Sequence, residues 1–186
     1  MRTLSVFNFL SLNGFYKGPS GDIGWHRHGE EEAEFSREGA GSGSTLLFGR
    51  VTYEMMAGFW PSEQAKQMDA AVAAGMNATE KIVFSRTLKQ AAWNNTRVVG
   101  GDIVAEMRKM KQGAGKGMTI LGSGTIVTQF AAAGLIDQFQ FMIDAVALGA
   151  GTPVLSGIPA PIRLTLTGTR TFKSGTVLLT YVPESS

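Results

Sequence analysis

Cysteine is absent from this chain of 186 residues, which excludes disulfide bonds, thiolate metal sites and cysteine nucleophiles. Long apolar runs are missing too, because no window approaches the roughly 20 apolar residues that a membrane span requires. The apolar start of the chain is short and is interrupted by Ser5 and Asn8, unlike the core of a signal peptide. We therefore expect a cytoplasmic protein that has no membrane partner.

Charge of either sign is limited, with 17 basic and 15 acidic residues and a formal net charge of +2. The sequence has no basic run and no lysine- or arginine-rich patch interleaved with aromatics, so we expect no nucleic-acid partner. Histidine is restricted to His26 and His28, with Glu30 following. Because a third well-placed ligand is lacking, we expect no metal site.

Apolar residues make up 44% of the chain and charged residues 17%, which is typical of a globular protein. A domain of this size buries about 70% of its unfolded surface, so its core needs no disulfide or metal. We expect residues 1–186 to form a single domain. The 24 glycines follow no period, which argues against a repeat array.

Short apolar runs alternate with helix-prone segments. The runs that we predict as strands are residues 4–12, 45–48, 81–84, 97–99, 118–121 and 137–143, with a C-terminal hairpin of 163–169 and 176–181. The predicted helices are residues 30–38, 53–58, 68–76, 103–111 and 125–133. Thr52 is expected near one helix cap and Asp102 at another. The glycine-rich residues 39–44 should form a flexible segment, and residues 16–29 and 145–155 should form loops.

This order predicts an α/β fold with three layers. Strands alternate with helices until about residue 135 and strands then take over, which indicates a mostly parallel central sheet with an antiparallel C-terminal hairpin. Helices on both faces of the sheet explain why the central strands are continuous apolar runs rather than alternating patterns.

Three buried strands are followed at once by small or cationic residues and then by a helix. These segments are Phe48-Gly49-Arg50-Val51-Thr52, Phe84-Ser85-Arg86-Thr87 and Leu121-Gly122-Ser123-Gly124-Thr125. Helix N-termini attract phosphate, glycine allows close approach of the backbone, and arginine matches phosphate oxygens. In an open α/β sheet such elements gather at the carboxyl ends of the strands.

Each of these turns is weak evidence by itself, because an ordinary strand-to-helix turn has the same form. The third one is not a complete G-x-G-x-x-G motif, since position 127 is valine. Three such turns together, two of them with arginine, favour a dinucleotide ligand.

The sequence resembles the dihydrofolate-reductase-like family over nearly its whole length. The segments that carry the resemblance are Ser11-Leu12-Asn13-Gly14-Phe15, Leu47-Phe48-Gly49-Arg50-Val51-Thr52-Tyr53-Glu54, Lys81-Ile82-Val83-Phe84-Ser85-Arg86-Thr87, Gly122-Ser123-Gly124 and Leu148-Gly149-Ala150-Gly151-Thr152-Pro153. The branch that it resembles more closely is related to the C-terminal reductase domain of the bifunctional riboflavin-biosynthesis deaminase–reductase. The deaminase zinc motif is absent.

The resemblance implies an NADPH-dependent oxidoreductase acting on a pyrimidine- or pterin-like heterocycle, similar to a 5-amino-6-(5-phosphoribosylamino)uracil reductase. It places Ser85 and Arg86 near the adenosine ribose, where a 2′-phosphate distinguishes NADPH from NADH. The family's phosphate-binding turn matches Gly49, Arg50 and Thr52. The turn under the pyrophosphate and the nicotinamide matches Gly122, Ser123, Gly124 and Thr125.

The resemblance also suggests a catalytic acid. Folate-reducing members carry a buried carboxylate on the first helix, and aligning on Phe35 puts Glu31 there, with Glu30 and Glu32 as alternatives. A carboxylate in an apolar cleft has a raised pKa and can assist protonation of the substrate. The other interpretation is that the three glutamates lie in a solvent-exposed first turn, where the helix dipole favours negative charge. Asn13 replaces the aspartate of many family members, which argues against acid chemistry from that loop.

Three classes of function follow from these residues. The leading hypothesis is the NADPH-dependent reductase with a small-molecule substrate. The second is a catalytically silent nucleotide- or small-molecule-binding protein on the same fold, and the third is an interaction module. A homodimer formed through the C-terminal hairpin is compatible with all three, and we expect one.

Overall fold

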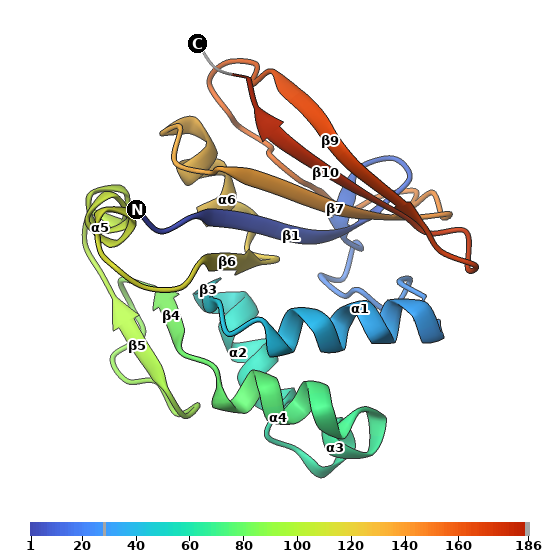
Figure 1. Ribbon diagram of the computed structural model, residues 1–186, viewed down its shortest axis with the longest axis horizontal. Coiled ribbons are helices and arrows are strands. Elements are labelled where there is room, and N and C mark those ends of the chain that lie inside the picture. Colours follow the sequence, from blue (N-terminus) through green and yellow to red (C-terminus); the bar gives the residue numbers. More distant parts are fainter. Residues whose placement is uncertain (28, 185–186) are drawn as a thin grey trace.

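An eight-stranded sheet forms the centre of the computed structural model, which describes residues 1–27 and 29–184 (Figure 1). Its strand order is β5-β4-β3-β6-β1-β7-β10-β9, and β2 and β8 form a separate two-stranded ribbon. The strands are β1 (Leu4–Ser11), β2 (Phe15–Lys17), β3 (Thr45–Gly49), β4 (Lys81–Phe84), β5 (Thr96–Val99), β6 (Met118–Leu121), β7 (Gln138–Asp144), β8 (Thr152–Pro153), β9 (Leu164–Thr171) and β10 (Val177–Pro183).

The strands from β5 to β7 are parallel, and β10 and β9 continue the sheet as an antiparallel hairpin. The predicted fold class is therefore confirmed. Strand β1 lies between β6 and β7 but pairs with them over different lengths. Its last partner on β6 is Leu121, opposite Phe7, whereas its pairing with β7 continues to Ser11 opposite Asp144. The end of β1 thus projects beyond β6.

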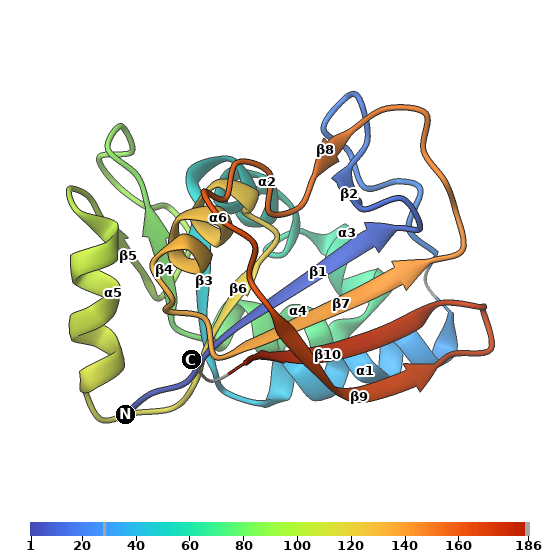
Figure 2. The same cartoon turned by 90° about the horizontal axis from the view of Figure 1, so that it is seen from above.

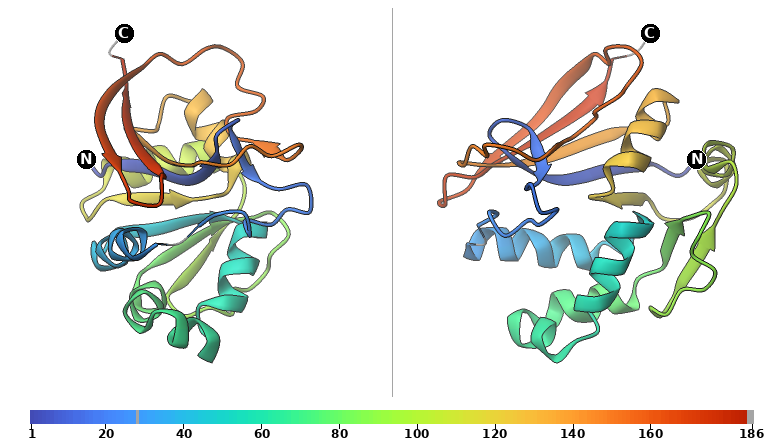
Figure 3. Two further views of the ribbon diagram at one scale, coloured as in Figure 1. Left: turned by 90° about the vertical axis from the view of Figure 1, so that its right-hand side faces the viewer. Right: turned by 180° about the vertical axis from the view of Figure 1, so that it is seen from behind.

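Helices cover both faces of the sheet (Figures 2 and 3). The helices are α1 (Glu30–Gly41), α2 (Arg50–Phe59), α3 (Glu63–Met68) and α4 (Ala70–Ala78) on one face, and α5 (Ile103–Gln112) and α6 (Gly124–Ala132) on the other. In β3, Phe48 packs in the cluster with α2 and α4, whereas Leu47 packs in the cluster with α5 and α6. Among the described residues, no helix is long and apolar enough to cross a membrane.

Helix α1 runs further than the sequence predicts. The expectation of a flexible segment from residue 39 is wrong, because the helix continues to Gly41. A Cβ atom at Gly75 of α4 would lie 2.9 Å from the Cβ of Ala40, so small residues here allow close contact between two helices. Helix α3 and the β2–β8 ribbon were not predicted, and the ribbon occupies segments that were expected to be loops.

A buried lysine ties α4 to β4. The Nζ atom of Lys81 donates hydrogen bonds to the carbonyl oxygens of Met76 (2.8 Å), Asn77 (3.2 Å) and Thr79 (2.6 Å), and it lies 4.4 Å from the centre of a Trp93 ring. These carbonyls are at the C-terminal end of α4, where the dipole favours a cation. Burial lowers the pKa of Lys81 to about 8, so the ammonium is largely protonated at neutral pH.

Replacing this lysine is expected to destabilise the protein. Lys81→Met leaves three carbonyl groups without their donor and should lower the free energy of unfolding by about 3 kcal/mol. Urea unfolding followed by circular dichroism measures the change. Lys66→Met on α3, where the lysine is exposed in a surface ion pair, should cost less than about 1 kcal/mol. Equal effects of the two substitutions would contradict this account.

Candidate cofactor-binding site

The carboxyl ends of β3, β4 and β6 border one groove with a volume of about 360 Å³. We call it the cofactor groove, and its lining residues are Tyr16, Lys17, Gly49, Arg50, Val51, Thr52, Phe84, Ser85, Arg86, Ile103, Ser123, Gly124, Thr125, Ile126 and Gln129. All the predicted cofactor-binding residues except Gly122 belong to this lining. Three turns that are far apart in the sequence are therefore brought to one edge of the sheet, as parallel strands require.

Ser123 holds two of these turns together. Its Oγ atom accepts a hydrogen bond from the Gly49 amide (2.9 Å) and donates one to the Leu121 carbonyl (3.0 Å). Ser123 is buried and has φ of 57°, a left-handed conformation that a single residue in a tight turn adopts at some cost. The resemblance places Ser123 in the turn under the pyrophosphate and the nicotinamide, and the structure shows that its hydroxyl fixes the spacing between β3 and β6.

Two helices begin at the groove with amide groups facing it. Glycine at position 49 has no side chain with which to cap α2, and the hydroxyl of Ser123, the N-cap residue of α6, bonds elsewhere. By contrast, Asp69 and Asp102 cap α4 and α5 with their carboxylates. In the first turn of α6, the Ile126 amide donates to the Ser123 carbonyl (3.0 Å) and the Gly124 amide bonds Tyr16, so the Thr125 amide and the first-turn amides of α2 are available to an anion.

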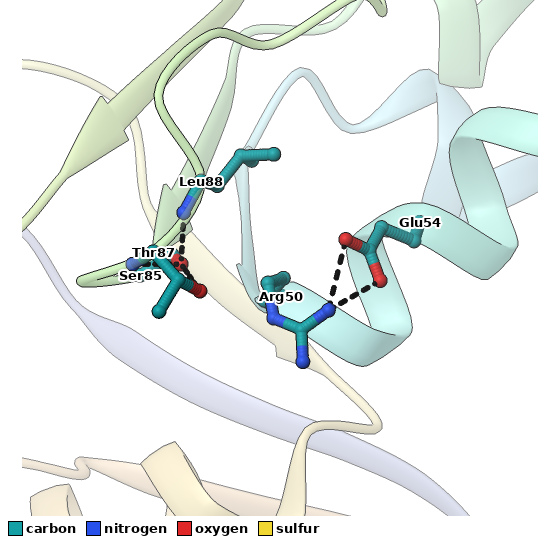
Figure 4. A network of polar contacts seen from close by, with 5 residues as sticks. All are labelled: Arg50, Glu54, Ser85, Thr87 and Leu88. Carbon is teal, nitrogen blue, oxygen red and sulfur yellow. Dashed lines mark hydrogen bonds and ion pairs between the residues drawn. The ribbon is translucent and has the colours of Figure 1, made fainter.

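Two arginines stand at the rim of the groove. Arg50, in the first turn of α2, forms an ion pair with Glu54 at 2.9 Å, and both side chains are about half exposed (Figure 4). Arg86 follows β4 and is exposed. Its neighbour Ser85 uses its hydroxyl oxygen to accept hydrogen bonds from the amides of Thr87 (3.2 Å) and Leu88 (2.9 Å). The Ser85 side chain therefore shapes the turn that presents Arg86.

Tyr16 is a groove residue that sequence reasoning missed. A Cβ atom at Gly124 would lie 2.6 Å from the Tyr16 hydroxyl oxygen, so the phenol ring lies directly on the start of α6. Burial raises the pKa of Tyr16, and a hydrogen bond with the Gly124 backbone partly offsets this effect. Tyr16 reaches the groove because β2 pairs with the distant β8, a pairing for which the local sequence carries no signal.

Residues 2–178 match the family described as the RibD C-terminal domain. The chain belongs to this family. This result confirms the resemblance drawn from the sequence motifs. The chain is also 28% identical over 172 residues to the uncharacterized protein YyaP of Bacillus subtilis (strain 168), a similarity that covers 92% of this chain and 90% of YyaP.

Solved structures share the fold of this RibD C-terminal domain. A putative riboflavin biosynthesis protein from Shewanella sp. PV-4 has a TM-score of 0.71 and 18% identity, covering 98% of this chain and 99% of that one. A deaminase/5-amino-6-(5-phosphoribosylamino)uracil reductase from Thermotoga maritima has a TM-score of 0.68 and 14% identity, covering 98% and 56%. Dihydrofolate reductase from Enterococcus faecalis, complexed with NADP(H), has a TM-score of 0.63 and 14% identity, covering 98% and 97%.

Glu31 and Glu32 of α1 bind the tip of the C-terminal hairpin. Glu31 accepts a hydrogen bond from the Lys173 amide (3.0 Å), and its carboxylate lies 3.2 Å from the Lys173 ammonium. Glu32 is buried and accepts a hydrogen bond from the Ser174 hydroxyl. Both glutamates lie outside the set of residues that line the cofactor groove.

These contacts correct two expectations for the glutamates. The hydrogen bond from the Lys173 amide lowers the pKa of Glu31, so the predicted raised pKa is wrong. The alternative of a solvated helix start fails for Glu32, which is buried. We conclude that Glu31 and Glu32 join α1 to the hairpin.

A buried histidine–aspartate pair anchors the loop before α1. His26 Nδ1 lies 2.6 Å from Asp144 Oδ2, and the imidazole stacks on Phe9 with ring centres 3.7 Å apart. The Arg27 amide donates a hydrogen bond to Asp144 Oδ1 (3.1 Å). His28, the other histidine weighed as a metal ligand, lies outside the described residues. Within residues 1–27 and 29–184, no group of three metal-ligating side chains occurs.

Proposed function

We propose that this chain is an NADPH-dependent reductase of a small pyrimidine- or pterin-like heterocycle. The observation that carries the proposal is the cofactor groove, in which the turns after three parallel strands, two helix N-termini and two arginines lie together. A dinucleotide is an elongated polyanion whose phosphates match such separated points. Membership of the RibD C-terminal domain family supports the proposal, as do the uracil reductase of Thermotoga maritima and the NADP(H)-bound enzyme of Enterococcus faecalis.

Each part of the groove has a distinct role in this proposal. The amides at the starts of α2 and α6, together with Arg50, bind the pyrophosphate, which can approach Gly124 closely once the Tyr16 ring has moved off it. Arg86 binds a 2′-phosphate on the adenosine ribose with its planar guanidinium group. Hydride transfer is the chemistry that the nicotinamide supplies, so this chain's residues bind the dinucleotide, orient it and exclude water.

The contacts of Glu31 and Glu32 favour a second candidate function, a nucleotide-binding protein without catalytic activity. Glu31 and Glu32 bond the hairpin and do not line the cofactor groove, so the groove itself supplies no carboxylate to protonate a substrate. A nucleotide-binding protein that lacks turnover therefore remains the alternative. Loss of NADPH absorbance on addition of 5-amino-6-(5-phosphoribosylamino)uracil or a pterin supports the reductase. Tight NADPH binding without oxidation by any such heterocycle favours the binding protein.

Arg86→Ala tests the identity of the cofactor. The substitution should weaken NADPH binding by about 10- to 100-fold, because a charge-assisted contact with the 2′-phosphate is worth about 1.5–3 kcal/mol. NADH binding should change little, since NADH lacks that phosphate. Fluorescence titration of both cofactors measures the effect, and Arg97→Ala, on the outer strand β5, is the matched control. An equal loss for NADPH and NADH would contradict the assignment of Arg86.

A further inference from the structure

Asn8 is a buried polar residue in the middle of the central strand β1. Its side chain is 2% exposed, and no described residue offers a hydrogen-bond partner to its Oδ1 or its Nδ2. A buried amide left without partners costs about 1–3 kcal/mol for each group, and such residues are rare in native proteins. Valine or leucine at this position would avoid that cost.

Among the described residues, several other buried polar side chains are paired, whereas both side-chain polar atoms of Asn8 and the Nε1 atom of Trp25 lack a hydrogen-bond partner. Lys81 donates to three carbonyls, Asp144 binds His26, and Glu32 accepts from Ser174. Buried polar groups of this chain are thus generally satisfied within the fold. Asn8 departs from this pattern with both of its side-chain polar atoms, and a partner from outside the chain would satisfy them.

Asn8 lies in the sheet close to the turn between β6 and α6, beneath the residues that line the cofactor groove rather than among them. Phe7 is the last residue of β1 that pairs with β6, and its carbonyl accepts a hydrogen bond from the Gly122 amide (3.3 Å). Asn8 is therefore the first residue after β1 and β6 separate. It shares a face of β1 with Val6 and Leu10, which pack in the cluster that contains the core residues of α6. This face lies beside the turn from which α6 begins.

We propose that Asn8 recognises a ligand by pairing its side-chain amide with a neutral amide edge of that ligand. The asparagine amide presents one acceptor beside a two-hydrogen donor, which complements a carboxamide or a lactam edge. This inference rests on the proposed function, which supplies two such groups: the carboxamide of the nicotinamide and the lactam edge of the pyrimidine or pterin.

Asn8→Leu, which keeps the approximate volume and removes the polar atoms, separates ligand recognition from a structural role. The variant should unfold at a higher temperature than the wild-type protein, because replacing unpartnered polar atoms by apolar ones removes a desolvation cost. It should bind its amide-bearing ligand about tenfold more weakly, because the paired hydrogen bonds are lost. Asn8→Ala, which adds no volume, should show the same loss of affinity.

Three probes in a titration identify the ligand group: NADPH, 2′-phospho-ADP-ribose and 5-amino-6-(5-phosphoribosylamino)uracil. Weaker NADPH binding with unchanged 2′-phospho-ADP-ribose binding, since the latter lacks nicotinamide, assigns Asn8 to the carboxamide. Weaker binding of the uracil alone assigns it to the lactam edge. Unchanged binding of all three, equal losses for all three, or a lower unfolding temperature would overturn the inference. If the proposed function itself is wrong, the wild-type protein will bind none of the three probes, and both proposals will fall.

Discussion

Gly124→Ala is expected to weaken NADPH binding by at least about 100-fold while the fold stays intact. The added methyl group would lie 2.6 Å from the Tyr16 hydroxyl oxygen and in front of the first amides of α6. A phosphate needs close approach to these amides, and a methyl group in its place cannot be accommodated by a small shift. Fluorescence titration with NADPH measures the loss.

The fold should survive Gly124→Ala because the atoms in conflict are the hydroxyl and two ring carbons of Tyr16, a side chain that is only partly buried and can rotate away. Alanine is also a better helix former than glycine at the start of α6. Thermal unfolding therefore should remain cooperative, with a midpoint close to that of the wild-type protein. Gly58→Ala on α2 is the matched control, since no described residue places an atom within 4 Å of a Cβ there. Wild-type affinity in Gly124→Ala would show that the ligand binds elsewhere.

Arg50→Ala is expected to weaken NADPH binding by about 10- to 100-fold, because it removes a cation at the start of α2 where the pyrophosphate is proposed to bind. Stability should change by less than about 1 kcal/mol, because the Arg50–Glu54 ion pair is about half exposed. The dependence of affinity on salt should also become shallower, since one charged contact is lost.

Glu54→Gln provides the opposite change at the same ion pair. In the free protein the Glu54 carboxylate holds the guanidinium group at 2.9 Å and therefore competes with a phosphate for it. Neutralising Glu54 should increase NADPH affinity by a few fold, as judged by the same titration. If Arg50→Ala and Glu54→Gln weakened binding equally, Arg50 would have no direct contact with the cofactor.

The sequence predicts the groove well because the groove is built from local features. Each of its three turns follows a short apolar strand, and the order of the strands along the chain determines a parallel sheet. The turns after β3 and β6 lead into α2 and α6, but the turn after β4 leads to β5, so the helix predicted after Arg86 is wrong. In such a sheet the carboxyl ends of the strands share one edge. The position of the turns around Gly49, Ser85 and Ser123 thus follows from patterns that span fewer than about 15 residues each.

Long-range contacts account for what the sequence could not predict. Glu31 bonds Lys173, 142 positions away, so its lowered pKa depends on how the hairpin folds onto α1. Tyr16 reaches the groove through the β2–β8 pairing. Asn13, a departure from the family pattern, exchanges hydrogen bonds with the backbone of Leu148 in a similar way. None of these partners is marked by spacing or periodicity.

The interpretation of Asn8 depends on its burial, which only the structure shows. In the sequence it is one polar residue that interrupts an apolar run and argues against a signal peptide. In the structure it is an unpartnered amide at the point where two central strands separate. Only the three-dimensional arrangement relates it to a ligand.

Amide hydrogen exchange during an NADPH titration tests most directly whether one dinucleotide contacts all three turns. The account predicts slower exchange at Arg50–Thr52, Arg86–Thr87 and Gly124–Ile126, with all three segments saturating at the same NADPH concentration. Peptides from α4, outside the groove, serve as the internal reference. Unchanged exchange in all three segments, or protection of only one of them, would contradict a cofactor site shared by β3, β4 and β6.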